Sequence, residues 1–302
     1  MKILLTGSSG QLGKSIIETK PSGIKLITPD RKTLDLSNPD SCESIIYKYT
    51  PDLVINAGAF TDVDQAEKEK KTALAVNAIA PEYLSKALLK TGGKLIQIST
   101  DFVFNGNQGS PYMPYQSLSP INTYGFTKAK GESAIEKVLG NRHQALILRT
   151  SWIMGAKGNN FALKILDLLN KKSNLRIISD QIGCPTSTTS LSNACWKIVL
   201  KKDKVFSVNQ APIPIYHFSD AGAASWYDVA IAIMEISKDL GIIEETREIK
   251  PIRTEDYITP AKRPNFSLLN CFSTREILNI KAINWRQALL YELDKIKKFN
   301  CK

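Results

Sequence analysis

The chain has 302 residues, of which 43% are hydrophobic and 23% charged, values typical of a globular protein and not of a disordered or low-complexity one. Forty Lys and Arg side chains against 29 Asp and Glu leave a formal net charge of +11. The basic residues form doublets spread along the chain, which favours a solvated surface facing anionic small molecules over a nucleic-acid interface.

The cysteines and histidines argue against a metal centre. Five cysteines form no Cys-x-x-Cys pair, and their odd number leaves one unpaired, as expected of reduced thiols in a cytoplasmic protein. The two histidines, His143 and His217, are far apart in the sequence, and we interpret His217 as a packed histidine in a strand. The first apolar run, residues 3–5, is too short for a signal peptide or a membrane span.

Short, continuously apolar runs alternate with amphipathic stretches through the first half of the chain. The apolar runs predict buried strands at residues 2–6, 25–28, 52–56, 94–99 and 145–149. The stretches between them predict helices at residues 11–20, 39–49, 64–89 with a break near Pro81, and 124–139. This alternation of strand and helix predicts a parallel sheet covered on both faces.

Beyond about residue 150 the alternation becomes less regular, with helices predicted at 161–169 and 226–240. We therefore expect an α/β fold: a Rossmann-like doubly wound parallel sheet with a smaller, interwoven C-terminal substrate-binding lobe. Residues 1–150 would form the dinucleotide-binding domain, to which residues 186–215 roughly return, and 151–302 would be mainly the substrate lobe. A ligand is expected in the cleft between them.

A glycine-rich loop follows the first strand and opens the first helix. The spacing of Gly7, Gly10 and Gly13 lets a backbone turn tightly and approach a pyrophosphate, which the helix N-terminus attracts. After the second strand come Asp30, which can take ribose hydroxyls, and Arg31, which can take a 2′-phosphate. The pattern predicts dinucleotide binding and leaves NADH and NADPH both open.

A tyrosine and a lysine four residues apart indicate proton-transfer chemistry. Tyr124 and Lys128 share one helical face, where the ammonium is expected to lower the pKa of the phenol. Thr100 ends a strand at the carboxyl edge of the sheet, where parallel sheets place their ligands. Tyr291 and Lys295 have the same spacing but no such partner, and we interpret them as ordinary surface and core.

These motifs, together with Asn56-Ala57-Gly58-Ala59 and Ser99-Thr100-Asp101, resemble the extended short-chain dehydrogenase/reductases. A longer series, in order from residue 1 to about 290, is similar to the dTDP-4-dehydrorhamnose reductase family. The segments that carry this similarity are residues 62–67, 99–104, 149–152, 158–161, 180–186 and 259–264.

The resemblance implies NADPH or NADH as cofactor. Gly10, Gln11 and Leu12 would lie along the pyrophosphate and Asp30 near the adenosine ribose. The remaining implied cofactor contacts border the adenine or line the path past the third strand: Asp35, Leu36, Ala57, Ala59, Phe60 and Thr61.

The resemblance also implies the reaction, which is reduction of the C4 ketone of dTDP-4-dehydro-L-rhamnose to dTDP-L-rhamnose for cell-surface polysaccharide synthesis. Tyr124 would donate the proton, Lys128 would hold the nicotinamide ribose, and Thr100 would bind the developing alkoxide. The remaining implied substrate contacts are Asp101, Trp152, Asn160 and Arg263, the last near the diphosphate.

Two departures from the family change what is expected. Some members carry acids for a magnesium ion that bridges two subunits, but Ser15 and Thr189 stand at two of those positions. We therefore expect no metal, and a monomer or a homodimer without a metal bridge. Phe102 replaces a common tyrosine and stands where related 4,6-dehydratases place a glutamate, which disfavours dehydration.

Two alternatives remain open from the sequence. The protein could reduce another nucleotide-linked 6-deoxy-4-ketosugar, since base and stereochemistry depend on pocket shape. It could instead be a regulatory subunit that binds dinucleotide without turnover, as in the beta subunit of methionine adenosyltransferase. The presence of Thr100, Tyr124 and Lys128 together favours catalysis.

Overall fold

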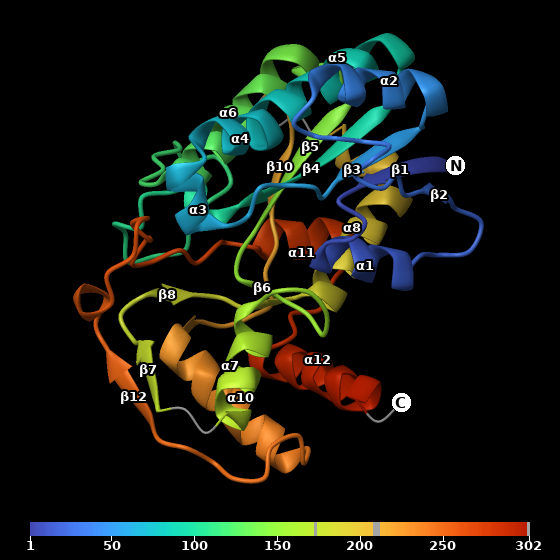
Figure 1. The fold of residues 1–302 in the computed structure, drawn as a ribbon. Coiled ribbons are helices and arrows are strands. Elements are labelled where there is room, and N and C mark those ends of the chain that lie inside the picture. Colours follow the sequence, from blue (N-terminus) through green and yellow to red (C-terminus); the bar gives the residue numbers. More distant parts are fainter. Residues whose placement is uncertain (172–173, 208–211, 301–302) are drawn as a thin grey trace.

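The computed structural model describes residues 1–171, 174–207 and 212–300 (Figure 1), so residues 208–211 of the predicted return segment and Cys301 lie outside it. Its centre is a six-stranded sheet in the order β10-β5-β4-β3-β1-β2, with every neighbouring pair parallel. The strands are β1 (Lys2–Thr6), β2 (Lys25–Ile27), β3 (Leu53–Asn56), β4 (Lys94–Thr100), β5 (Ala145–Thr150) and β10 (Ile215–His217). The predicted parallel sheet is confirmed.

Alternating side chains of each strand build two cores, one on each face of the sheet. Ile3 and Leu5 of β1 pack with α1 (Gln11–Glu18) and α8 (Thr188–Leu200), while Leu4 packs with the helices of the opposite face. Those helices are α2 (Pro39–Tyr49), α5 (Ala80–Thr91) and α6 (Thr123–Leu139), above the sheet in Figure 1. Strands buried on both faces explain why their sequences are continuously apolar.

The helical stretch predicted at 64–89 is interrupted at a different place. It consists of α3 (Val63–Lys68), α4 (Lys70–Leu74), a π-helical turn (Ala75–Ile79) and α5. The chain leaves helical geometry at Glu69, with φ −108° and ψ 48°, so the break near Pro81 was wrong. Pro81 lies in the first turn of α5, directly after the π-helical turn, and the chain stays helical through it.

A third core, which belongs to the smaller lobe, lies below the sheet in Figure 1. It is built mainly from α7 (Phe161–Asn170), α10 (Trp226–Asp239) and α12 (Trp285–Asn300). Three two-stranded pairs complete it: β7 (Leu175–Ile178) with β12 (Ile249–Ile252), β8 (Ile182–Gly183) with β11 (Ala224–Ser225), and β6 (Ile153–Met154) with β9 (Thr186–Ser187). The short helices are α9 (Lys202–Val205), α11 (Phe272–Leu278) and two 3₁₀ turns (Asp101–Val103, Thr254–Asp256).

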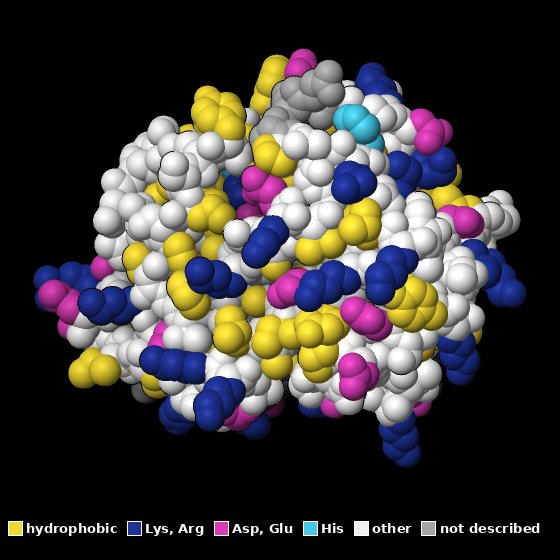
Figure 2. Space-filling model, turned by 90° about the horizontal axis from the view of Figure 1, so that it is seen from above, with side chains coloured by type: hydrophobic (Ala, Val, Ile, Leu, Met, Phe, Trp, Pro, Cys, Tyr) yellow, Lys and Arg dark blue, Asp and Glu magenta, His cyan; other side chains and the backbone are white. Residues whose placement is uncertain are grey.

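The two halves of the chain are interwoven, because α8, β10 and α11 return to the large sheet after α7 has joined the smaller core. Of the described residues, none belongs to a helix long and apolar enough to cross a bilayer. On the face shown in Figure 2, Lys and Arg side chains are scattered among acidic and apolar ones and do not form one basic patch.

Candidate active site

A cavity of about 940 Å³ opens at the carboxyl ends of the parallel strands, between β1 and β3. After β1 the chain continues to β2 on one side of the sheet, and after β3 it continues to β4 on the other side. Ligands of open α/β sheets bind at such a switch point, outside the carboxyl ends of the strands. Every site residue predicted from the sequence lines this cavity: Gly7, Gly10, Gln11, Leu12, Gly13, Asp30, Arg31, Asp35, Leu36, Ala57, Ala59, Phe60, Thr61, Thr100, Asp101, Tyr124, Lys128, Trp152, Asn160 and Arg263.

The glycine-rich loop forms one end of the cavity. Gly7 has a φ of 64°, and a Cβ there would lie 2.6 Å from the backbone of Gly58. A Cβ on Gly13 would lie 2.1 Å from the carbonyl oxygen of Gly7. Gly10, the N-cap of α1, offers no side-chain acceptor to the first helical turn, so the cavity beside it suits an anionic group such as a pyrophosphate.

Two carboxylates, Asp30 and Asp35, line the cavity together with the glycine-rich loop. Asp30 accepts a hydrogen bond from the backbone N–H of Thr33, and Asp35 accepts from the backbone N–H and hydroxyl of Ser37. These hydrogen bonds lower the pKa of both carboxyls, so both stay ionised near neutral pH. Ionised acids here can accept hydrogen bonds from ribose hydroxyls.

Asn77 was missed from the sequence, although it positions the loop after β3. Its Oδ1 accepts from the Phe60 backbone N–H at 2.9 Å, and its Nδ2 donates to the Phe60 carbonyl at 3.0 Å and to Thr127 Oγ1. It lies in the π-helical turn with 2% of its surface exposed. Such turns often mark functional sites, and a buried polar residue within the apolar pattern before Pro81 was the available signal.

Two acceptors fix the start of α6 and with it the place of Tyr124. Asn122 caps the helix by accepting from the Gly125 N–H, and Glu67 accepts from both the N–H and the hydroxyl of Thr123 at 2.7 Å. One turn later, the ammonium of Lys128 donates to the backbone carbonyl of Ile98 on β4. Tyr124 and Lys128 therefore lie on the face of α6 that borders the cavity.

The Lys128 ammonium is not among the groups that lower the pKa of the Tyr124 phenol, although the sequence predicted that effect. Burial raises the pKa of the Tyr124 phenol to about 12, and the group that lowers it is the hydroxyl of Thr100. The Lys128 ammonium is directed at the Ile98 carbonyl, and burial lowers its own pKa to about 8 against the opposing charge of Glu132. The spacing placed the two groups together, but their burial and partners decide their acidity.

Thr100 and Asp101 lie beside Tyr124 at the end of β4. Thr100 Oγ1 donates to Asp101 Oδ1 at 3.0 Å and accepts from the Phe102 N–H at 3.2 Å. Burial raises the pKa of Asp101 to about 7, while the hydroxyls of Ser267 and Thr100 act in the opposite direction. This end of the cavity holds a hydroxyl, a phenol and a carboxyl that is partly neutral near physiological pH.

An indole pair forms the wall of the cavity on the side of the smaller lobe. Trp152 has a φ of 44°, and its ring stacks on Trp226 with 3.6 Å between centroids and 6° between planes. A Cβ on Gly183 would overlap the Trp152 indole. Trp226, at the start of α10, also borders the cavity. A stacked indole pair offers an apolar surface to a sugar ring or base.

Two polar contacts join distant segments across the cavity. Gln11 of the glycine-rich loop donates to the Asn159 carbonyl at 3.0 Å and accepts from Asn160 at 2.8 Å. Arg263 pairs with Asp64 of α3, with 2.7 Å between Nη2 and Oδ2. Its other terminal nitrogen donates to Thr259. Asp64 thus holds the guanidinium at the cavity rim.

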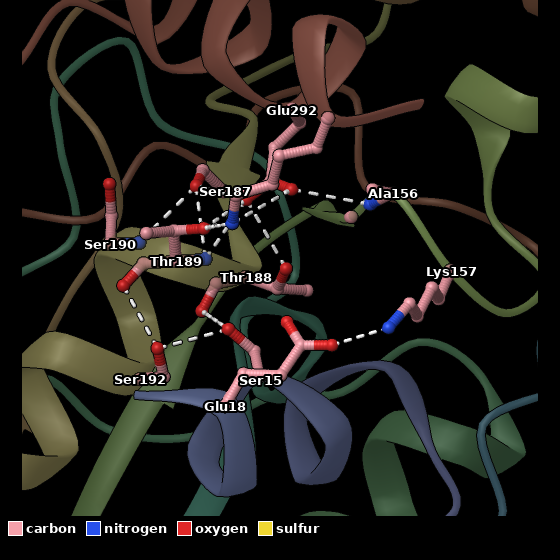
Figure 3. A network of polar contacts seen from close by, with 12 residues as sticks. Ser15, Glu18, Ala156, Lys157, Ser187, Thr188, Thr189, Ser190, Ser192 and Glu292 are labelled. Atoms are coloured by element: carbon pink, nitrogen blue, oxygen red, sulfur yellow. Dashed lines mark hydrogen bonds and ion pairs between the residues drawn. The ribbon is translucent and has the colours of Figure 1, made fainter. Parts of the chain in front are cut away.

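The positions of the family's metal acids lie in a different network (Figure 3). Ser15 donates to the Thr188 carbonyl, and the Thr189 hydroxyl donates to Glu292 at 2.7 Å. Glu292 is 2% exposed and also accepts from Ser187 Oγ and the Ala156 N–H. The described ranges, which omit residues 172–173, 208–211 and 301–302, contain no cluster of three His, Cys, Asp or Glu able to hold a metal.

The other predictions concern residues outside the cavity. His217 is fully buried on β10, as predicted; its Nδ1 lies 3.0 Å from the Tyr112 carbonyl and its Nε2 lies 3.3 Å from Arg149. Tyr291 is half exposed on α12, and Lys295 contacts Thr189, away from the cavity.

Comparisons with known proteins agree with this geometry. The family model described as the RmlD substrate binding domain matches residues 1–298. A dTDP-4-dehydrorhamnose reductase of Aggregatibacter actinomycetemcomitans is 34% identical over 290 residues, covering 95% of this chain and 97% of that protein. The chain belongs to the dTDP-4-dehydrorhamnose reductase family. The resemblance inferred from the motifs is thereby confirmed.

Two further relatives of this family member bear on its chemistry. The spore coat polysaccharide biosynthesis protein SpsK of Bacillus subtilis is 38% identical over 289 residues, covering 95% of each chain. The crystal structure of a dTDP-4-dehydrorhamnose reductase from Bacillus anthracis in complex with NADP has a TM-score of 0.87 at 29% identity, covering 97% of this chain and 99% of that one. The NAD(P)H-dependent oxidoreductase class expected from the sequence agrees with the family and with this NADP complex.

Proposed function

We propose that this family member reduces the C4 ketone of dTDP-4-dehydro-L-rhamnose to dTDP-L-rhamnose, with NADPH or NADH as reductant. The observation that carries the proposal is one cavity that has a glycine-rich helix start at one end and Thr100, Tyr124 and Lys128 at the other. The family membership supplies the substrate class.

The residues at the cofactor end fit a dinucleotide. The uncapped first turn of α1 suits the pyrophosphate, and the ionised Asp30 suits ribose hydroxyls. Arg31 lines the same part of the cavity and can pair with a 2′-phosphate. Leu36 packs against Gly58, where a Cβ would lie 2.4 Å from its Cδ1, and forms an apolar edge suited to the adenine.

At the other end of the cavity, side chains of the protein donate the proton and stabilise the charge that develops on the ketone oxygen. A bound reduced nicotinamide supplies the hydride. Tyr124 donates its phenolic proton to the ketone oxygen as the C4 alcohol forms, and Thr100 stabilises the developing charge by a hydrogen bond. The buried ammonium of Lys128, held by the Ile98 carbonyl one turn from Tyr124, borders the same end of the cavity and is placed to bind the nicotinamide ribose.

The rest of the cavity suits the nucleotide sugar. The Trp152 and Trp226 indoles offer a stacking surface, and Arg263 at the rim can bind the diphosphate. Asn160 donates a hydrogen bond to Gln11 and therefore lies beside the glycine-rich loop. We propose that any contact it makes with the substrate is made there.

The decisive experiment follows cofactor oxidation at about 340 nm, where reduced nicotinamide absorbs. The substrate is dTDP-4-dehydro-L-rhamnose made in situ, with NADPH and NADH tested in parallel. We expect dTDP-L-rhamnose as product and a fall in kcat of about 100-fold or more in Tyr124→Phe, which keeps the ring but lacks the acidic hydroxyl. Binding of cofactor and substrate without turnover would contradict the proposal.

A second candidate function has a specific observation in its favour. SpsK, at 38% identity, is named for spore coat polysaccharide biosynthesis and not for one sugar. The protein would then reduce another nucleotide-linked 6-deoxy-4-ketosugar with the same residues. Comparing kcat/KM for ketosugars that differ in base or stereochemistry separates the two, since the preferred substrate should exceed the others at least tenfold. Cofactor binding without turnover of any ketosugar would favour a regulatory subunit.

The proposal also covers the cellular location and the oligomeric state of the protein. We propose a cytoplasmic monomer or homodimer without a metal bridge. The Glu292 network bears on the metal bridge alone, because hydroxyl and amide donors of the chain itself satisfy that carboxylate. Lys295 lies 3.9 Å from Glu292 and supplies positive charge there.

A further inference from the structure

The short helix α3 carries two carboxylates on one face, and each of them binds a different element at the cavity. Asp64 and Glu67 are three residues apart, so their side chains leave the helix on the same side. Asp64 binds the segment that carries Arg263. Glu67 binds the first turn of α6, which carries Tyr124 and packs against α3 (Figure 1). Arg263 and Tyr124 both line the cavity.

Asp64 fixes both the backbone and the side chain of its segment. Its Oδ1 accepts from the Ala261 N–H at 3.1 Å and from Arg263 Nη1 at 3.2 Å, and its Oδ2 accepts from Arg263 Nη2 at 2.7 Å. Two terminal nitrogens on one carboxylate set the plane of the guanidinium as well as its position. The Thr259 hydroxyl, which accepts from Nη1 at 2.7 Å, supports the same orientation.

Glu67 holds the start of α6 with both of its oxygens. Oε1 accepts from the Thr123 N–H and Oε2 accepts from the Thr123 hydroxyl, each at 2.7 Å. Thr123 is the first residue of α6 and directly precedes Tyr124, so this N–H is one that the helix itself leaves unpaired. A carboxylate that accepts from the backbone and the side chain of one residue fixes the position and the rotation of that turn.

A third contact joins the two bound elements directly. Asn122, the N-cap of α6, accepts from the Gly125 N–H and donates from its Nδ2 to the Lys262 carbonyl at 2.8 Å. Lys262 belongs to the segment that Asp64 binds. The contacts therefore form a closed ring of three parts: α3, residues 261–263 and the start of α6. In a closed ring, no part can move relative to the others without breaking a hydrogen bond.

Both carboxylates of the ring are ionised near neutral pH. Burial acts against the ionised forms, but the hydrogen bonds from Arg263 to Asp64 and from Thr123 to Glu67 outweigh it, so the pKa of each carboxyl is lowered. The hydrogen bonds to α3 are therefore charge-assisted under ordinary assay conditions, which makes them stronger than bonds between neutral groups.

We propose that α3 sets the spacing between Arg263 and Tyr124, and that Glu67 is the positioning residue of the proton donor. The inference rests on the proposed reductase activity, in which Arg263 binds the diphosphate and Tyr124 protonates the ketone oxygen. A nucleotide sugar held at Arg263 then meets a phenol at a fixed distance, so binding energy at the diphosphate serves the chemical step. Neither Glu67 nor Asp64 lines the cavity, and both act through the residues that they hold.

The test measures the KM for the ketosugar and the single-turnover rate of cofactor oxidation, which reports the chemical step, in the whole protein. Glu67→Ala removes both acceptor oxygens. It should lower the single-turnover rate about tenfold, while the KM for the ketosugar and the Kd of the reduced cofactor stay within about twofold. A general loosening of the fold would raise the KM and the Kd as well.

Two matched variants support the assignment. Glu67→Gln keeps one acceptor oxygen for Thr123 and should restore the rate to within about threefold of the wild type. Glu82→Gln removes an exposed acid of α5, which pairs with Lys86 away from the cavity, and should leave the rate unchanged. Should Glu67→Ala not fold, Thr123→Val removes one of the two donors and should lower the rate about threefold.

A double variant tests the ring itself. Asn122→Ser keeps a capping oxygen for α6, but its side chain is too short to donate to the Lys262 carbonyl. Alone, it should lower the single-turnover rate about threefold, because the segment of Arg263 is no longer tied to α6. In the Glu67→Ala background it should have no further effect, since the start of α6 is already released.

Two results would overturn the inference. One is a wild-type single-turnover rate in Glu67→Ala, or in Thr123→Val when that variant replaces it. The other is a double variant of Asn122 and Glu67 whose losses are the product of the single losses, which would show that the two contacts act independently. Absence of turnover in the wild type would instead contradict the proposed function, so the two failures are distinguishable.

Discussion

Glu132 and Arg149 form an ion pair inside the protein, with 2.6 Å between Oε2 and Nη2 and exposures of 4% and 1%. Arg149 also donates from Nε to both carboxylate oxygens, and Ser99 donates to Oε1. Glu132 lies one turn after Lys128, so the pair joins α6 to β5 and to the end of β4 next to Thr100.

This pair leads to a prediction about stability. Glu132→Gln leaves the Arg149 charge buried without its counter-ion, which should lower the free energy of unfolding by about 3 to 5 kcal/mol. Urea denaturation measures this loss. The surface pair of Lys171 and Asp167 is mostly exposed, so Asp167→Asn should change stability by less than about 0.5 kcal/mol. Equal losses in the two variants would show that the buried pair is not a major contributor.

The stacked indoles should contribute to binding of the nucleotide sugar. Trp226→Leu removes the aromatic partner of Trp152 and should raise the KM for the ketosugar about five- to tenfold, since such pairs contribute about 0.5 to 1.5 kcal/mol. The KM for NADPH should stay within about twofold. Trp285→Phe, in the same lobe but off the cavity, is the control. A parallel rise in both KM values would assign the pair to the cofactor or to the fold.

Arg263 should be specific for the diphosphate of the substrate. Arg263→Met keeps an apolar stem but removes the donors, and should weaken dTDP binding by about ten- to 100-fold. Binding of thymidine, which has no phosphate, should be unaffected. Asp64→Asn frees the guanidinium from its partner and should have a smaller effect. Isothermal titration with dTDP and thymidine decides this, and equal losses for the two ligands would contradict the assignment.

The buried carboxyl of Asp220, which follows β10 in the chain, should make the stability of the protein depend on pH. Burial raises the pKa of Asp220 to about 6, against 3.8 for the ordinary group. Between these values the folded protein binds more protons than the unfolded chain, so the Asp220 contribution, about 3 kcal/mol, is present below about pH 4 and lost as pH rises through 6.

Urea midpoints measured at about pH 4 and about pH 7 test this prediction. The fall in stability between them should be smaller in Asp220→Asn than in the wild type, because the variant lacks the titrating group. Arg275 and Glu292 also act on Asp220, and both remain in the variant. An identical pH dependence in the two proteins would show that Asp220 does not titrate in this range.

The elements predicted well are those specified by short stretches of chain. The strands at 2–6 and 53–56 follow from continuous apolar runs, and the helix at 39–49 follows from the Asn38 cap and Pro39. The stretch at 64–89 was predicted less well, since the break at Glu69 and the π-helical turn around Asn77 depend on contacts with the Phe60 loop and α6.

The parallel sheet, the glycine-rich loop and most residues around the cavity could be predicted from the amino-acid sequence, because apolar period, glycine spacing and ordered motifs are local properties of the chain. How those residues behave depends on contacts between segments that are distant in the sequence. Asp64 meets Arg263 across 199 positions, and Trp226 joins Trp152 at the cavity. Burial sets the pKa values of Tyr124 and Asp101, and burial exists only after distant segments have packed together.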